Sequence, residues 1–73
     1  MVTAQSWLDA FADRLGFDAP GEQEMSNILD LAGCAAHASH RSAAPVACWL
    51  AARAGLSPEE ALEIARSVSG NDA

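Results

Sequence analysis

Residues 25–39 read MSNILDLAGCAAHAS, and this stretch decides how the rest of the chain is expected to fold. Its apolar side chains recur at steps of three and four residues, which is the period of an α-helix. They form two stripes, which are Met25, Ile28, Leu29, Ala32, Ala36 and Ser39, and Leu31, Ala35 and Ala38. The stripes lie roughly 100 to 120° apart around the axis, so apolar surface covers much of the circumference. We therefore predict a central helix over residues 21–40.

An amphipathic helix is predicted before it, over residues 4–15. Thr3 can cap the start of this helix, and Gly16 can end it in the left-handed conformation. Phe17 then stands where a hydrophobic contact accompanies such an end. The apolar stripe of this helix consists of Ala4, Trp7, Leu8, Phe11, Ala12 and Leu15.

Two more helices are predicted after the central one. Pro45 suits the first turn of a helix and pushes the preceding residue out of helical backbone, so we expect a helix over 45–54. Ser57-Pro58-Glu59-Glu60 combines an N-cap serine, a proline at the first helical position and a capping box, so the next helix is expected over 58–69. The expected buried stripes are Val46, Trp49, Leu50 and Ala54 in the first, and Ala61, Leu62, Ala65 and Val68 in the second.

No segment alternates with period two, which excludes a sheet from the prediction. The expected fold is all-α, a compact four-helix bundle-like single domain over 1–73 with a frayed tail at 70–73. Its core is expected to be thin, because 17 of the 73 residues are alanine and only two Trp and two Phe supply aromatic bulk. Oligomerisation or docking on a partner would help such a core.

The charge of the chain narrows the choice of partners. Ten acidic residues against four arginines and no lysine give a net charge of −6, which repels phosphate backbones and anionic lipids. We therefore expect no nucleic-acid and no membrane partner. The N-terminus lacks the basic start of a secretory signal, so the expected compartment is the cytoplasm, where Cys34 and Cys48 would be free thiols.

The sharpest chemical pattern is Cys34, His37 and His40 on the central helix, with Cys48 as a fourth metal ligand to consider. These three ligands fan over about 120° of the helix, and the outer two lie roughly 9 Å apart, too far for one tetrahedral zinc. A nucleophilic cysteine next to a histidine is also weighed, but a chain of this size has little room for a substrate pocket. We expect no catalytic residue, no metal and no cofactor.

The main alternative function is a helix-turn-helix DNA-binding protein that uses residues 50–66. Residues 50–57 have the small residue, the turn glycine and the apolar spacing of that motif. The recognition helix, however, would present Glu59, Glu60 and Glu63 to the DNA, with only Arg66 to offset them. This alternative therefore ranks below protein binding.

The remaining polar stripe of the central helix is the candidate binding surface. Asp30, His37 and Arg41 follow at i, i+7 and i+11, with Gly33 between them. A glycine in the middle of a helix indicates close approach by another backbone, either a helix of the same domain or a partner. Arg41 would supply a forked donor for a carboxylate or a phosphate. The predicted partner-binding residues are Asp30, His37, Arg41, Pro45 and Trp49.

Several of these residues belong to a recognisable motif. The chain resembles, from about Trp7 to Val68, a small actinobacterial domain of uncharacterised function, found alone or behind the nucleotidyltransferase that makes molybdenum guanine dinucleotide cofactor. The similarity rests on Leu29-Asp30-Leu31-Ala32, Ala36-His37, Arg41, Ala43-Ala44-Pro45 and Leu50-Ala51, with Trp7 and Leu8 opening the domain. His40 departs from the pattern, which usually has an acidic residue before the arginine.

The resemblance implies a setting in molybdenum-cofactor synthesis or insertion, or beside a molybdoenzyme. It also implies that His37, Arg41 and Pro45 are binding or fold-defining residues. Together with the composition, it leads us to expect a non-catalytic protein-binding or accessory module. The expected partner is a protein, for example a molybdenum-cofactor enzyme or a second copy of the chain.

Overall fold

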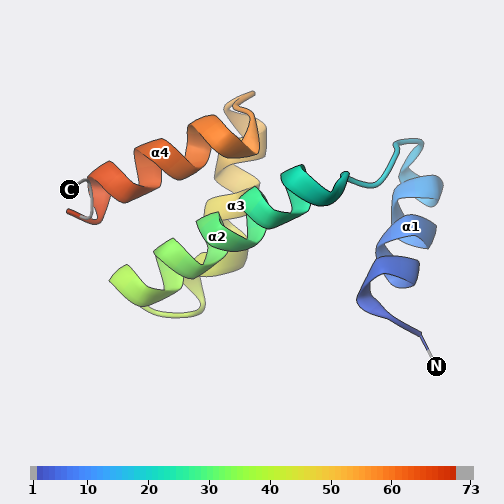
Figure 1. The fold of residues 1–73 in the computed structure, drawn as a ribbon, viewed down its shortest axis with the longest axis horizontal. Coiled ribbons are helices and arrows are strands. Elements are labelled where there is room, and N and C mark those ends of the chain that lie inside the picture. Colours follow the sequence, from blue (N-terminus) through green and yellow to red (C-terminus); the bar gives the residue numbers. More distant parts are fainter. Residues whose placement is uncertain (1, 71–73) are drawn as a thin grey trace.

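The computed structural model describes residues 2–70, and within this range it contains four helices and no strand. The all-α prediction is therefore confirmed. Residue 1 and residues 71–73, which include most of the tail expected to fray, lie outside the described residues. The helices are α1 (Ala4–Leu15), α2 (Glu22–Ala38), α3 (Ala43–Arg53) and α4 (Pro58–Val68) (Figure 1).

The helix α2 is the centre of the packed part, as its double apolar stripe predicts. Both α3 and α4 pack against α2, and they meet each other only over a small area. The buried core consists of Leu31 from α2 and Ala61 and Leu62 from α4. Around it lie the half-buried Cys34, Cys48, Ala51, Leu56 and Ala65. A core of three buried side chains, one of them alanine, confirms the expectation of a thin core.

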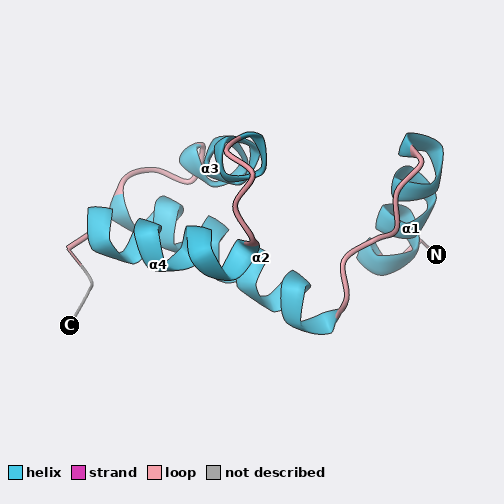
Figure 2. Ribbon diagram, turned by 90° about the horizontal axis from the view of Figure 1, so that it is seen from above, coloured by secondary structure: helices cyan, strands magenta, loops and turns pink. Residues whose placement is uncertain are grey.

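The helix α1 lies apart from this packed part. Figures 1 and 2 both place it beyond the N-terminal end of α2, connected by an extended segment over residues 16–21. Within the described chain, α1 makes no contact with any other helix, and none of its residues is buried. The four-helix count is thus confirmed, but only three of the helices share a core.

The turn between α2 and α3 differs from the expected one at both ends. The helix α2 ends at Ala38, because Ser39 leaves helical backbone at φ of −142° and ψ of −84°, and the Ser39 hydroxyl donates a hydrogen bond to the Ala35 carbonyl at 2.8 Å. The helix α3 begins at Ala43, two residues before the expected start at Pro45. Pro45 is tolerated at the third helical position, since the first four N–H groups of a helix have no intrahelical acceptor.

Local capping agrees with the sequence at the other helix ends. The Ser57 hydroxyl accepts a hydrogen bond from the Glu60 N–H at 3.1 Å, and the Glu60 carboxylate accepts one from the Ser57 N–H at 3.0 Å. This is the predicted capping box. Gly16 ends α1 with φ of 81°, also as predicted, although the Phe17 side chain after it is 76% exposed and makes little of the expected hydrophobic contact. Over residues 2–70, no helix has both the length and the hydropathy that a membrane span requires.

Candidate functional site

The face that α3 turns toward the core is not the expected one. We expected Val46, Trp49 and Leu50 to form its buried stripe, but all three are more than half exposed. Cys48 and Ala51 pack on the core instead. The prediction was wrong because alanine and cysteine allow α2 and α3 to approach closely, which larger side chains at the contact would prevent. The bulky side chains of α3 are thereby left at the surface.

One part of this exposed surface combines an aromatic ring with a cation. Trp49 is 58% exposed, and the Arg53 guanidinium carbon lies 5.1 Å from the centre of its ring. Pro45 and Val46 precede Trp49 by four and three residues, so they share its side of the helix, and both are exposed. We name this surface the α3 face, and it consists of Pro45, Val46, Trp49 and Arg53.

The structure divides the predicted partner-binding residues between two places. Asp30 and His37 line a shallow hollow of about 330 Å³ between α2 and α4, together with Gly33 and Arg66. Pro45 and Trp49 belong to the α3 face, on a different helix. Arg41 is exposed in the turn between α2 and α3 and is not among the residues that line the hollow.

Two charged residues of these surfaces were not among the predicted partner-binding residues. Arg66 lies in the hollow because α4 packs against α2, and nothing in the local sequence signals that contact. Arg53 could have been predicted as a neighbour of Trp49. It follows Trp49 by four residues, and this spacing brings two side chains together on a helix. Gly33 does not mark a close approach within residues 2–70, because a side chain built there would meet no atom within 4 Å.

The Cys34, His37 and His40 pattern is broken up by the fold. His40 lies outside α2, and its Nδ1 is 3.1 Å from the Ser42 hydroxyl oxygen. Cys34 packs against the core and also lines the hollow with Asp30 and His37, and its Sγ lies 3.4 Å from the Ser69 hydroxyl oxygen. Among residues 2–70, no group of three or more His, Cys, Asp or Glu side chains is arranged to hold a metal ion.

Both cysteines are free thiols in the structure. Burial raises the pKa of the Cys48 thiol, since the thiolate loses hydration in its half-buried position between α3 and α2. Cys48 therefore stays protonated at neutral pH and behaves as a small apolar residue of the core.

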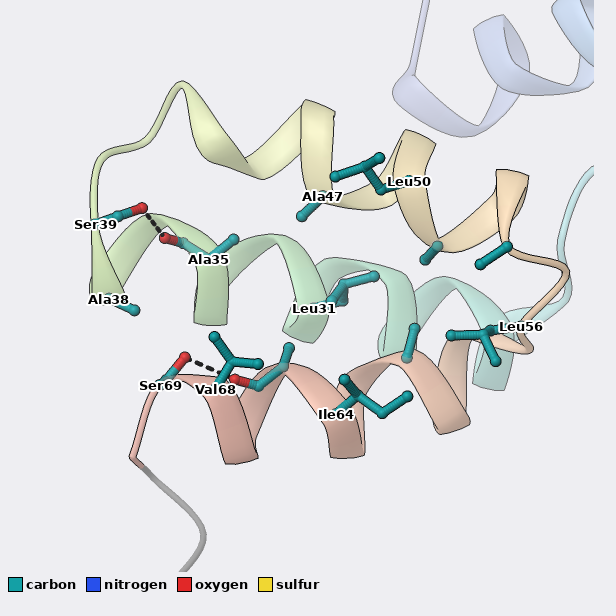
Figure 3. Close-up of a pocket in the computed structure, with 14 residues that line it drawn as sticks. Leu31, Ala35, Ala38, Ser39, Ala47, Leu50, Leu56, Ile64, Val68 and Ser69 are labelled. Atoms are coloured by element: carbon teal, nitrogen blue, oxygen red, sulfur yellow. Dashed lines mark hydrogen bonds between the residues drawn. The ribbon is translucent and has the colours of Figure 1, made fainter.

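A second surface feature is an apolar groove of about 640 Å³ that runs between α3 and α4 (Figure 3). Leu31 and Ala35 of α2 form its floor, and Figure 3 shows Leu50 and Ile64 on its opposite sides. Most of the remaining lining is small or apolar. It consists of Ala38, Ser39, Ala47, Ala51, Ala54, Leu56, Ala61, Ala65, Val68 and Ser69.

The segment of the helix-turn-helix alternative forms α3, a tight turn and α4. Gly55 takes φ of 77° in that turn. Glu59, Glu60 and Glu63 are all exposed on α4, where a recognition helix would meet the DNA. Their charges would repel phosphates, so this geometry gives the alternative no added support.

Residues 1–71 match the model of a family described as a domain of unknown function, DUF6457, and the chain therefore belongs to that family. The match covers all four helices. No curated relative and no solved structure matches the chain.

Proposed function

We propose that this DUF6457 domain is a non-catalytic protein-binding module that contacts its partner through the α3 face. The observation that carries the proposal is the pairing of Trp49, 58% exposed, with Arg53 over its ring at 5.1 Å. A partner that covers the Trp49 ring would remove apolar surface from water, which favours binding. Tryptophan and arginine are also the residue types that contribute most often to binding energy at protein interfaces.

The surroundings of Trp49 favour a protein ligand. The flat ring offers apolar contact area, and the Arg53 guanidinium over that ring adds charged hydrogen-bond donors. Arg41, exposed one turn before Pro45, adds a second guanidinium that can hold a carboxylate with two parallel hydrogen bonds. An arginine over the aromatic ring, with a second arginine exposed in the turn before α3, suits an acidic and partly apolar patch on the partner.

The proposed client is an enzyme of molybdenum-cofactor synthesis or insertion, in the cytoplasm of an actinobacterium. This part rests on the resemblance in the Ala36-His37, Arg41 and Ala43-Ala44-Pro45 motif. The motif residues Arg41 and Pro45 flank the start of α3, and Pro45 shares the side of the helix that carries Trp49, which connects the resemblance to the α3 face. His37 lies in the hollow between α2 and α4 and is proposed to have a minor role.

The test is titration calorimetry of the purified chain against the molybdenum cofactor guanylyltransferase of the same organism. Trp49→Ala is expected to weaken binding about 30-fold, the effect of losing one interface hot spot. Trp7→Ala is the matched control, because Trp7 is 55% exposed but belongs to α1. Its affinity for the enzyme should equal that of the wild type.

A second pair of variants tests the charged part of the surface. Arg41→Ala is expected to weaken binding about tenfold, as the loss of a charged hydrogen bond does. Arg14→Ala removes the same charge from α1 and should have no effect. Equal losses for the two tryptophan variants would exclude the α3 face. No binding by the wild type would exclude this enzyme as the client.

A further inference from the structure

The helix α1 is well formed but packs against no other helix within residues 2–70. Its start is capped by Thr3, whose hydroxyl accepts a hydrogen bond from the Ser6 N–H at 3.0 Å. Its end is closed at Gly16, where the Phe17 N–H reaches the Ala12 carbonyl at 2.9 Å. Helices of 12 residues are nevertheless marginal in water, and most helical stability comes from packing an apolar face. Such a helix needs a surface to dock on.

The exposed apolar face of α1 consists of large side chains. Trp7, Phe11 and Leu15 are each about half exposed and follow one another at four-residue steps. Trp7 and Phe11 stack with ring centres 5.0 Å apart, so they form one continuous aromatic surface. Of the four aromatic residues in the chain, three lie in residues 7–17, outside the packed helices.

The groove between α3 and α4 has the opposite character. Half of its lining residues are alanine, so it has room where a fully packed domain would have larger side chains. Figure 3 shows Leu31 on the floor with Leu50 and Ile64 on either side, all apolar. Large side chains on one helix and small ones in the groove are the complementary halves of a packed helix contact.

The dimensions of the two surfaces also agree. From Trp7 to Leu15 the helix α1 rises about 12 Å, at 1.5 Å for each residue. The groove follows α4 from Ala61 to Ser69, which is the same rise of about 12 Å. A helix in this position would be the fourth member of a bundle whose other members are α2, α3 and α4.

We propose that the α1 helix of one copy fills the groove of a second copy, so that two chains form a symmetric dimer with exchanged helices. The segment 16–21 holds α1 beyond the end of α2, away from its own groove (Figures 1 and 2). An arm displaced in this way reaches a second molecule, and twofold symmetry gives each groove one helix. This proposal does not depend on the proposed function, because it uses neither Trp49 nor Arg53.

The area available suits a weak but specific dimer. Each helix-in-groove contact removes about 300 Å² from the helix and a similar area from the groove, and symmetry provides two contacts. The total of about 1,200 Å² is at the lower limit for stable protein interfaces. Each chain carries a net charge of −6, so the copies repel each other and added salt should strengthen the dimer.

The experiment is sedimentation equilibrium of the full 73-residue chain and two variants, each at several concentrations. Phe11→Asp places a charge on the docking face of α1, and Ile64→Asp places one at the side of the groove. Each variant should raise the dimer dissociation constant about 30-fold or more. Trp49→Ala, which alters the α3 face only, should dimerise like the wild type. Circular dichroism checks that every variant is folded.

Mixing the two charged variants distinguishes exchange between copies from closure within one chain. A mixed dimer retains one intact contact, between the unaltered α1 of Ile64→Asp and the unaltered groove of Phe11→Asp. We expect the mixture to dimerise more strongly than either variant alone. A wild type that stays monomeric at millimolar concentration would overturn the proposal, and so would a dimer that Phe11→Asp leaves intact. A mixture that dimerises no more strongly than either variant alone would also overturn the proposal.

Discussion

The helices α1 and α4 have similar caps at their ends, but only α4 is packed into the core. In each helix the hydroxyl of the N-cap residue accepts a hydrogen bond from the N–H three residues later. The N-cap residue is Thr3 in α1 and Ser57 in α4. Each is followed by a glycine with positive φ, at Gly16 and Gly70. Yet α4 buries two residues in the core, and α1 buries none.

This contrast shows that the features which specify a helix are different from those which bury it in a core. Caps and spacing act within a few residues, so they specify both helices equally well. Burial needs a second surface of matching shape, which α2 supplies to α4 and, within the described chain, no helix supplies to α1. Changes in α4 should therefore alter global stability, whereas the same changes in α1 should act only locally in the monomer.

The largest difference is expected for truncation of an apolar side chain. Leu62→Ala should lower the free energy of unfolding by about 3 kcal/mol, because it removes one of three buried residues and leaves a cavity. Phe11→Ala should lower it by about 0.5 kcal/mol or less at micromolar concentration. Urea unfolding followed by circular dichroism measures both. A loss for Phe11→Ala near that for Leu62→Ala would show that α1 packs on its own chain.

The next effect concerns the glycines that end helices. Gly55→Ala should lower the free energy of unfolding by about 1 to 2 kcal/mol. A residue with a side chain is strained at φ of 77°, and this turn joins α3 to α4. Gly16→Ala meets the same strain at φ of 81°. It should fray the end of α1 without shifting the urea midpoint, and amide exchange of residues 12–17 would report the fraying. A shifted midpoint for Gly16→Ala would contradict the isolation of α1.

A smaller difference is expected at the two N-caps. Ser57→Ala should lower the free energy of unfolding by about 1 kcal/mol, since the Glu60 N–H loses its acceptor at the start of a packed helix. Thr3→Ala removes the same bond from α1 and should reduce helical ellipticity at 222 nm with little change in the midpoint. Equal midpoint shifts for the two variants would remove the distinction between the helices.

The smallest effect is a pH dependence that only α4 should show. The Ser57 N–H and hydroxyl donate hydrogen bonds to the carboxylate and lower the pKa of Glu60 below its ordinary value. A lowered folded-state pKa contributes stability above the unfolded pKa, and this contribution is lost as pH falls through the folded pKa. Glu60→Gln should flatten this part of the acid profile. In α1 the same position is Ser6, which does not titrate, so Ser6→Ala should leave the profile unchanged in shape.

Local features were predictable because their causes are local. The bounds of α1, the capping box at Ser57 and the turn at Gly55 all follow from residues within one turn of the feature. The start of α3 was less predictable. A proline fits any of the first positions of a helix, and only the preceding turn decides which of these positions Pro45 occupies. Ala43 and Ala44 enter α3 through hydrogen bonds to the carbonyls of residues 40 and 41.

The buried faces were harder to predict because alanine is abundant on every side of α2 and α3. Leu29 and Leu31 were placed on the two apolar stripes of the central helix, yet Leu29 is 61% exposed while Leu31 forms the core. In α3 the apolar stripe of bulky residues competes with one of small residues, and close approach to α2 favours the small one.

The candidate site shows the same division. Pro45 was predicted from the Ala43-Ala44-Pro45 motif and Trp49 from its place near that motif, although the apolar spacing also placed Trp49 on a buried stripe. The hollow that joins Asp30 and His37 to Arg66 depends on the contact between α2 and α4. Asp30 and Arg66 are 36 positions apart in the sequence, so their order gives no sign of this contact.

The sequence by itself determined four helices, their caps, the acidic charge and the shortage of bulky core residues. These properties follow from individual residues and from the helical period, which need no distant partner. Only the tertiary structure decided that α2, α3 and α4 share one core, that Trp49 faces outward, and that α1 stands apart from the groove between α3 and α4. Burial depends on how surfaces from different helices fit together, and several fits satisfy the same apolar pattern when most of its members are alanine.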